Sequence, residues 1–368
     1  PVMVRPSFVL GGRSMEVVFD DETLKRYMVE AVKISPEHPI LIDKFLENAV
    51  EVDVDAVCDA ERVVIAAIME HIEQAGIHSG DSACVIPTRT LSPEVLATIR
   101  RHTAALGKAL GVRGLMNIQY AVKDSTVYVL EVNPRASRTV PYVCKATGAQ
   151  VAQIATKVMA GMTLKEIGFT EEVKINHYAV KEAVLPFHKF PGARVALGPE
   201  MRSTGEVMGI DMNYGLAFLK SQSAAGARIP LEGGVFISVN ENDKPRVIDI
   251  AQRFQKAGYR LFATRGTHLF LQENGVATER VFKVNEGRPH VVDLMIDKTI
   301  NLIINTPGGQ GSHADEKAIR SNAVVREIPL VTTLAAANAI IDGIEARMEH
   351  SITIKALQDY HLEIAQGK

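Results

Sequence analysis

The stretch NIQYAVKDSTVYVLEVNPR, residues 117–135, decides the fold of this chain. It holds two strand-like runs on either side of a Lys-Asp-Ser turn signal at residues 123–125, so it predicts a β-hairpin. Residues two apart on a strand share a face, so Glu131 and Asn133 point the same way. A turn in this place brings Gln119 roughly opposite Glu131. One carboxylate and two amide oxygens then converge on one patch.

Oxygen ligands of this kind suit Mg²⁺, which usually completes its shell with water and substrate phosphates. Arg135 follows directly and adds a guanidinium to the patch. A Glu-x-Asn pair in isolation is more often an exposed polar strand face than a metal site. The metal interpretation therefore depends on the rest of the chain.

The composition is that of an ordinary globular protein, with 46% hydrophobic and 23% charged residues in 368 positions. This length predicts two or three domains. The 41 basic and 43 acidic side chains give a net charge of −2, which offers no bulk attraction to nucleic acid or to an anionic membrane. We therefore expect neither as a partner.

The cysteines are odd in number and without paired spacing, which argues against a disulfide framework and against a zinc site: Cys58, Cys84 and Cys144. No apolar run approaches the roughly 20 residues that span a bilayer. Both observations indicate a reducing, cytoplasmic compartment. The chain opens with Pro1 and enters a strand-like segment at once, so we expect the tail of a longer protein, and the lack of a targeting signal proves nothing.

Hydrophobic spacing predicts the elements of the first half. Asp20 and Asp21 cap a helix, and Ser92-Pro93 opens another that runs to about Gly111. A further helix is expected at residues 150–162. The predicted strands are residues 1–7, a buried strand at residues 39–46, and a half-buried strand with an acidic outer face at residues 51–58.

The second half changes character. Residues 192–209 are rich in Gly and Pro, which is typical of ordered loops within a domain, and residues 221–234 have linker composition. Beyond them a strand–helix–strand order predicts a small parallel α/β domain. Its expected elements are strands at 235–239, 261–263, 291–294 and 300–304, a helix from Pro245 to Gly258, and one or two helices from Leu334 onward.

Three motifs suit a nucleotide. A glycine-rich turn at residues 11–14 offers backbone N–H groups to phosphate, and Arg5 adds a permanent positive charge. Residues 42–46 (IDKFL) could pair their backbone with adenine, while Glu51 accepts from ribose hydroxyls. They equally suit a buried strand that ends in a solvated glutamate. Residues 76–83 (GIHSGDSA) are small and polar, which suits close backbone approach to a ligand.

Taken in order, these pieces resemble the ATP-grasp fold, and in particular the large subunit of carbamoyl phosphate synthetase. The resemblance spans essentially the whole chain. Biotin-dependent carboxylases share the Glu-x-Asn-x-Arg core but not the KATG and PEMRSTGE runs. The motifs that carry the resemblance are EVNPRASR (131–138), KATG (145–148), RPS (5–7) with GGR (11–13), EVDVD (51–55), HSGDS (78–82) and GPEMRSTGE (198–206).

This resemblance implies an α/β and α+β multidomain protein, with a partial ATP-grasp fold followed by a small parallel-sheet domain like methylglyoxal synthase. In that family two homologous ATP-grasp halves share one large subunit, and the chain looks like most of the second half plus the terminal regulatory domain. The implied boundaries are 1–143 for the partial ATP-grasp domain, 144–225 for the remainder of the carbamoyl-phosphate-forming domain, 226–232 for a linker and 233–368 for the allosteric domain.

The resemblance also implies site residues. Gln119 and Glu131 would hold one Mg²⁺ or Mn²⁺, and Glu131 with Asn133 a second, so that two ions accompany each ATP. Arg135 would be catalytic and would steady the transferring phosphoryl group or carbamate. The implied ATP contacts are Arg5, Lys44, Leu46, Glu51, Gly76, Ile77, His78, Ser79, Gln119 and Glu131.

In the terminal domain six positions match those that cradle a nucleotide monophosphate such as UMP or IMP in the family: Ser238, Lys244, Thr264, Thr267, Lys283 and Asn305. Hydroxyls and lysines suit a phosphate dianion, although both lysines could equally be surface charges. Two departures weaken the match, because Pro307 stands where some relatives have a hydroxyl and Gln310 where arginine is common. The loop 308–311 also lacks the Gly-Asp pairing of a methylglyoxal synthase, so regulation is expected rather than independent catalysis.

The implied activity is ATP-dependent phosphorylation of carbamate to carbamoyl phosphate by a glutamine-hydrolysing synthetase that feeds arginine and pyrimidine biosynthesis. A small glutaminase subunit or domain is the partner that the family implies. Two alternatives stay open. The chain could be a catalytically incomplete fragment that binds nucleotide and effector, or it could belong to another ATP-grasp ligase.

Overall fold

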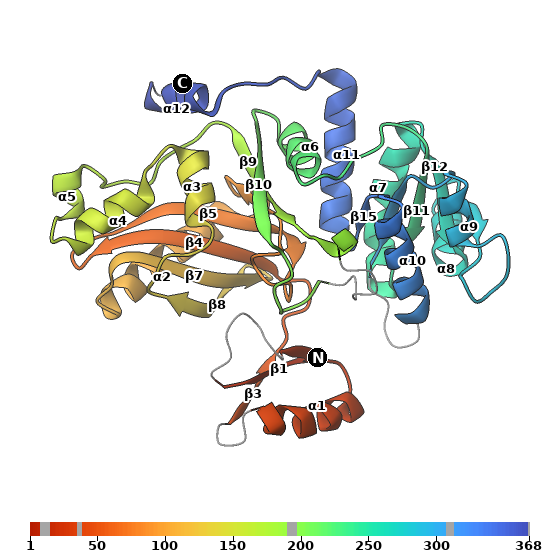
Figure 1. Cartoon of the computed structure of the whole chain (residues 1–368), viewed down its shortest axis with the longest axis horizontal. Coiled ribbons are helices and arrows are strands. Elements are labelled where there is room, and N and C mark those ends of the chain that lie inside the picture. Colours follow the sequence, from red (N-terminus) through yellow and green to blue (C-terminus); the bar gives the residue numbers. More distant parts are fainter. Residues whose placement is uncertain (8–14, 35–38, 190–196, 307–312, 367–368) are drawn as a thin grey trace. The chain divides into compact units, whose positions relative to one another are not determined.

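The computed structural model describes residues 1–7, 15–34, 39–189, 197–306 and 313–366 (Figure 1). By contacts the chain forms two compact units. The first comprises Pro1–Ala183, Leu197–Ser203 and Ile354–Lys368, and the second comprises Val184–Ala196 and Thr204–Thr353. Residues of each unit are therefore not continuous in sequence.

The first unit opens with a small antiparallel sheet in the order β2-β1-β3, packed against helix α1 (Asp21–Ile34). Its strands are β1 (Val2–Pro6), β2 (Glu16–Val18) and β3 (Ile40–Lys44). The predicted cap is confirmed, because the Asp20 carboxylate accepts the Thr23 N–H at 2.7 Å. The prediction of a buried strand at residues 39–46 is wrong. In the described part of the chain β3 pairs with β1 alone and lies at the edge of the sheet, and most of it is exposed.

The large sheet is antiparallel, and within the first unit its strands follow the order β9-β6-β5-β4-β7-β8. Helix α2 (Pro93–Ala109), capped by Ser92 as predicted, covers one face, and α3 and α4 lie over the other (Figure 1). The strands and helices are β4 (Val50–Asp59), β5 (Val63–Gln74), β6 (Cys84–Ile86), β7 (Arg113–Lys123), β8 (Thr126–Asn133), β9 (Tyr178–Val184), α3 (Val140–Thr147), α4 (Val151–Met159) and α5 (Leu164–Ile167).

Strand β4 lies in the middle of this sheet, between β5 and β7. Val54 on one face joins a core with Ile99 of α2 and with Ile118 of β7. The expected alternation of apolar and acidic residues along the strand is therefore present. The prediction that the acidic face is exposed to solvent is wrong. Asp53 and Asp55 are only 2% and 1% exposed, because the sheet is covered on that side too.

Helix α12 (Leu357–Ala365), which follows the second unit in sequence, packs on α3 in the first unit. His361 Nε2 lies 2.7 Å from the Lys145 carbonyl oxygen, and the Tyr360 ring meets the His177 ring edge-on at 5.1 Å. Tyr360 is only 4% exposed, so this contact is a packed interface.

The second unit contains the predicted parallel sheet, in the order β13-β12-β11-β14-β15. Its strands are β11 (Gly234–Ser238), β12 (Arg260–Thr264), β13 (Glu279–Val281), β14 (Leu302–Asn305) and β15 (Leu330–Val331). Its helices are α7 (Lys244–Lys256), α8 (Arg265–Glu273), α9 (Val291–Ile296), α10 (His313–Val325) and α11 (Leu334–Glu349), with short 3₁₀ turns at Phe187–Lys189 and Glu241–Asp243.

Two sequence predictions fail here. Residues 291–294 form the first turn of α9 instead of a strand, because the His290 ring and the Asp293 carboxylate make a reciprocal capping box. Residues 221–234 are not all linker, since helix α6 (Tyr214–Ala224) extends into them. This helix packs on β10 (Gly205–Asp211) and on α11. Among the described residues no helix is long and apolar enough to cross a bilayer.

Candidate functional site

The predicted hairpin is confirmed, with the predicted register. Strands β7 and β8 pair antiparallel, and Gln119 lies opposite Glu131. The two residues of the turn, Asp124 and Ser125, have φ angles of 48° and 63°. Left-handed conformations at both central positions are typical of the type I′ turns that match the twist of a two-residue hairpin.

Strand β4 extends this patch on its other side. Asp53 lies opposite Gln119, and Asp55 lies opposite Asn117, which in turn lies opposite Asn133. Polar side chains thus form two adjacent rows across β4, β7 and β8 on one face of the sheet. The rows are Asp53–Gln119–Glu131 and Asp55–Asn117–Asn133.

The metal ligands implied by the family resemblance are neighbours in these rows. Asn133 Nδ2 donates to Glu131 Oε1 at 2.8 Å, and Gln119 Nε2 donates to Ser79 Oγ at 3.0 Å. Glu131 is exposed, whereas the two amides are partly buried. Within the described part of the chain no cluster of three or more His, Cys, Asp or Glu could hold a metal. The proposed set is of another kind, because two of its three members are amides.

Asp55 anchors the segment that follows Arg135. Its carboxylate accepts hydrogen bonds from Asn117 Nδ2 at 3.0 Å, Ser137 Oγ at 2.8 Å and Thr139 Oγ1 at 2.6 Å. Burial raises the pKa of Asp55 to about 6, although these three donors act in the opposite direction. Arg135 itself is exposed and donates to the Ala136 carbonyl oxygen at 3.0 Å.

Glu51 is held at both carboxylate oxygens. Oε1 accepts the Gly76 N–H at 3.1 Å, and Oε2 lies 3.4 Å from His71 Nδ1. His71 Nε2 lies 3.0 Å from Asp53 Oδ2. Burial disfavours a charged ring, but Cys84 and the Asp53 and Glu51 carboxylates raise the pKa of His71 well above its usual value. Asp53 Oδ1 is buried and has no hydrogen-bond partner among the residues that the structure describes.

The loop at residues 76–83 joins the nucleotide motifs to the metal patch. A Cβ on Gly76, whose φ is +101°, would lie 2.9 Å from the Phe45 ring. Phe45 belongs to the predicted hinge at residues 42–46, so the hinge packs directly against the loop. Ser79 contacts Gln119 through its hydroxyl, and its carbonyl oxygen accepts from the buried Lys181 Nζ at 3.2 Å. Burial lowers the pKa of His78, and the Arg138 charge acts in the same direction.

A second segment fastens this loop. The Asp81 carboxylate accepts the N–H groups of Arg202 at 2.7 Å and Ser203 at 2.8 Å, and the His78 N–H donates to the Gly198 carbonyl oxygen at 2.8 Å. Sequence reasoning missed Asp53, Asp55, His71 and Lys181 as site residues. The one available signal was the charge of these residues in otherwise apolar strands.

The remaining predicted nucleotide residues lie nearer the start of the chain. Arg5 Nε forms an ion pair with Asp43 Oδ2 at 3.1 Å, across the β1–β3 pair. Lys44 ends β3 and is exposed, and Leu46 follows it partly buried. The glycine-rich turn at residues 11–14 lies outside the described residues.

In the second unit four of the six predicted effector residues meet at the carboxyl ends of parallel strands, where α/β sheets commonly bind ligands. Ser238 Oγ and Thr264 Oγ1 are 3.2 Å apart, Asn305 Nδ2 donates to the Ser238 carbonyl oxygen at 3.3 Å, and Thr267 Oγ1 accepts the Val239 N–H at 3.3 Å.

The two lysines differ in their surroundings. Lys244 Nζ pairs with Glu241 Oε1 at 2.7 Å and would lie 3.5 Å from a Cβ on Gly266, next to Thr267. Lys283 lies two residues beyond β13. Arg320 Nε, 3.5 Å from Asn305 Oδ1, is a buried cation that sequence reasoning missed. Pro307 and Gln310 lie outside the described residues.

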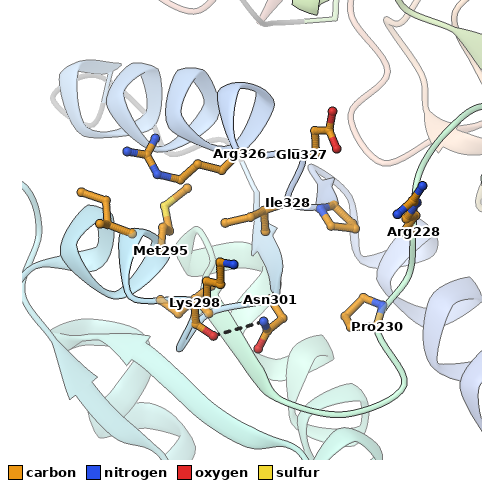
Figure 2. Close-up of a pocket in the computed structure, with 11 residues that line it drawn as sticks. Arg228, Pro230, Met295, Lys298, Asn301, Arg326, Glu327 and Ile328 are labelled. Carbon is orange, nitrogen blue, oxygen red and sulfur yellow. Dashed lines mark hydrogen bonds between the residues drawn. The ribbon is translucent and has the colours of Figure 1, made fainter.

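Figure 2 shows a pocket of about 480 Å³ near the opposite, amino ends of β11 and β14. None of the six predicted effector residues lines it. Lys298 and Arg326 on its wall follow the last residues of α9 and α10. Cations are favourable at helix C-termini, so their presence there has a structural reason. The residues drawn are Arg228, Pro230, Met295, Ile296, Lys298, Ile300, Asn301, Arg326, Glu327, Ile328 and Pro329.

These features define a protein with an ATP-binding domain of ATP-grasp type and a parallel α/β domain. Comparison with known families agrees. Residues 1–167 match the family of the carbamoyl-phosphate synthase L chain, ATP binding domain, and residues 246–332 match the MGS-like domain. The resemblance to the large subunit of carbamoyl phosphate synthetase and the expected fold class are confirmed.

Individual relatives extend the match over nearly the whole chain. The carbamoyl phosphate synthase large chain of Archaeoglobus fulgidus is 54% identical over 364 residues, which is 99% of this chain and 34% of the relative. That of Methanoregula boonei is 56% identical over 360 residues, 98% of this chain and 34% of the relative. The chain thus spans about a third of the length of the curated relatives it matches.

Among solved structures, the biotin carboxylase domain of the Hydrogenobacter thermophilus 2-oxoglutarate carboxylase, in complex with MgADP, ADP and bicarbonate, has a TM-score of 0.47. It is 19% identical, and the match covers 61% of this chain and 56% of that one.

Proposed function

We propose that this chain is the part of a carbamoyl phosphate synthase large chain that binds Mg-ATP and transfers its terminal phosphoryl group to carbamate. The observation that carries the proposal is the hydrogen bond from Gln119 to Ser79. Gln119 lies opposite Glu131, and Ser79 belongs to the nucleotide loop. The metal patch and the nucleotide loop are therefore one site.

The donor set fits a hard cation. Gln119 donates an amide N–H to Ser79, and Asn133 donates one to Glu131. Each amide oxygen is thus the atom left to meet a cation, and carboxylate and amide oxygens are ligands that Mg²⁺ accepts beside phosphates and water. Mn²⁺ accepts the same set. Two ions per site, both touching Glu131, remain part of the proposal.

Phosphoryl transfer needs positioning and charge neutralisation more than covalent chemistry. Mg²⁺ held by Gln119, Glu131 and Asn133 would supply positive charge that neutralises the phosphates. In this proposal Glu51 would accept from a ribose hydroxyl, and the backbone near Leu46 would pair with adenine. Arg135 projects from the segment that Asp55 anchors and would steady the phosphoryl group or carbamate.

The test measures ATP formation from carbamoyl phosphate and Mg-ADP by the 368-residue chain. We expect Glu131→Gln to lose at least about a hundredfold in rate, because it removes the charge that the cation binds. Glu171→Gln, at an exposed position outside the proposed site, is the control and should match the wild type. Near-normal turnover by Glu131→Gln would refute the assignment.

The parallel domain supports a second proposed role, binding of a nucleotide monophosphate such as UMP or IMP. Support comes from the hydroxyls and the Asn305 amide that meet at the carboxyl ends of β11, β12 and β14. For the whole protein the family implies a glutaminase partner and a place in arginine and pyrimidine biosynthesis. Binding of Mg-ADP and UMP or IMP without ATP formation would instead favour a nucleotide- and effector-binding role for this chain alone.

A further inference from the structure

His71 on β5 is a histidine with a carboxylate at each ring nitrogen. Nδ1 faces Glu51 Oε2 at 3.4 Å, and Nε2 faces Asp53 Oδ2 at 3.0 Å. The side chain is 2% exposed, so water does not compete for these contacts. Only a ring protonated at both nitrogens can donate to both carboxylates. The raised pKa of His71 agrees with that state.

This arrangement fixes Glu51, a side chain with three rotatable bonds. Its other oxygen accepts the Gly76 N–H at 3.1 Å, so the carboxylate is held by the loop on one side and by His71 on the other. A partly buried acceptor held in this way meets a ligand hydroxyl in a preset direction. An acceptor that must be immobilised on binding contributes less affinity.

We propose that His71 is a positioning residue for the nucleotide ribose, which it serves by aiming the Glu51 carboxylate at a ribose hydroxyl. The inference rests on the proposed function, in which Glu51 accepts from that hydroxyl. A purely structural role is the competing explanation, because β4 and β5 are neighbours and His71 could simply satisfy the buried Asp53 carboxylate and the partly buried Glu51 carboxylate. The two roles predict different ligand selectivity.

Two variants separate them. In His71→Asn the amide nitrogen takes the place of Nδ1 and keeps a donor toward Glu51. In His71→Gln it takes the place of Nε2 and keeps a donor toward Asp53. Both variants lose the positive charge and one hydrogen bond. If the role of His71 is structural, both variants should be impaired to a similar extent. If His71 orients Glu51, His71→Gln should be impaired more, because it loses the donor toward Glu51.

The experiment is calorimetry of the 368-residue chain with Mg-ADP, 2′-deoxy-ADP and 3′-deoxy-ADP. We expect the wild type to prefer ADP about tenfold over at least one deoxy analogue, as a hydrogen bond to a charged acceptor implies. His71→Asn should keep most of this preference, and His71→Gln should reduce it to about twofold or less. His177→Gln, at a buried histidine of the same unit that contacts the Ala146 carbonyl oxygen, should leave the ratio unchanged.

The outcomes are distinguishable. A wild type that fails to bind Mg-ADP overturns the proposed function, and this inference with it. A wild type that discriminates against the deoxy analogue, with the same ratio in both His71 variants, overturns the inference alone. If neither variant folds, the ring N–H signals of His71 in the ¹⁵N-labelled wild type decide. They should differ between the ADP and 2′,3′-dideoxy-ADP complexes, and identical signals would contradict the proposal.

Discussion

The buried Asp55 carboxylate contributes to the site by holding other residues in place. Asp55 accepts from Ser137 and Thr139, which follow Arg135 in the chain, and from Asn117 in the neighbouring strand. It thereby fastens the arginine-bearing segment to the middle of the sheet. Burial makes this anchor sensitive to pH, because it raises the pKa of Asp55 from 3.8 to about 6.

We predict a pH-dependent stability term from Asp55. Between about pH 4 and pH 6 Asp55 is protonated in the folded chain but ionised in the unfolded chain. The contribution of Asp55 to the free energy of unfolding therefore falls as pH rises through that window. A shift of about 2 units corresponds to about 3 kcal/mol. Asp55→Asn cannot titrate. The free energy of unfolding of the wild type minus that of the variant, measured in urea from pH 4 to pH 8, should therefore decrease up to about pH 6 and then level off.

Subtracting the variant cancels the titration of groups distant from the substitution. A difference that does not change with pH would contradict the raised pKa.

At the scale of elements, the sequence predicted those helices and strands whose formation depends on neighbouring residues. The β7–β8 hairpin follows from alternating strands and a Lys-Asp-Ser turn, and α2 follows from Ser92-Pro93. The burial of β4 did not follow, because its neighbours β5 and β7 are brought to it by long-range pairing. For the same reason Asp53 and Asp55 looked like a solvated face. His71 lies on β5, an element that the hydrophobic pattern did not reveal.

Helices α6 and α11 cross at glycines. A Cβ on Gly215 would lie 2.5 Å from the Asp342 carbonyl oxygen, and one on Gly343 would lie 2.6 Å from Leu219 Cγ. The contact on Gly215 is with backbone, which cannot rotate away as a side chain can. This close approach explains why residues 204–224 belong with the parallel domain by contacts, although most of them precede the stretch of linker composition.

We predict that Gly215→Ala lowers the free energy of unfolding by about 2 kcal/mol or more, because overpacking forces the two helices apart. Gly266→Ala in α8 is the matched control, since a Cβ there meets only Lys244 Nζ at 3.5 Å. It should be neutral or slightly stabilising, by up to about 1 kcal/mol, as alanine is the better helix former. Equal stability of the two variants in urea unfolding would argue against the close crossing.

At the scale of the whole molecule, the sequence indicated both kinds of domain but not how the chain is divided between them. Composition places a boundary at residues 221–234, where small and flexible residues gather. Composition carries no sign that residues 354–368 group with the first unit. That grouping depends on His361 meeting Lys145 of α3 and on Tyr360 meeting His177, and contacts between residues so far apart in the sequence leave no local pattern.

We predict that Tyr360→Ala weakens the docking of α12 by about 3 kcal/mol, because it removes a buried aromatic ring that packs on His177 and lies 4.5 Å from Lys355 Nζ. Leu362→Ala, at a 58% exposed position of the same helix, is the control and should change little. Limited proteolysis reports the difference, since residues 357–365 are cleaved more readily once α12 is released. Equal cleavage of both variants would show that Tyr360 does not hold the helix.

The chain alternates between the two units along its sequence, and this has a consequence for biosynthesis. The backbone passes between them four times, after residues 183, 196, 203 and 353. A ribosome releases the chain from its amino end, so the first unit waits for its final helix until the second has been translated. Folding of the two is thus coupled in time, and one nick between residues 204 and 353 would leave neither product with a complete first unit.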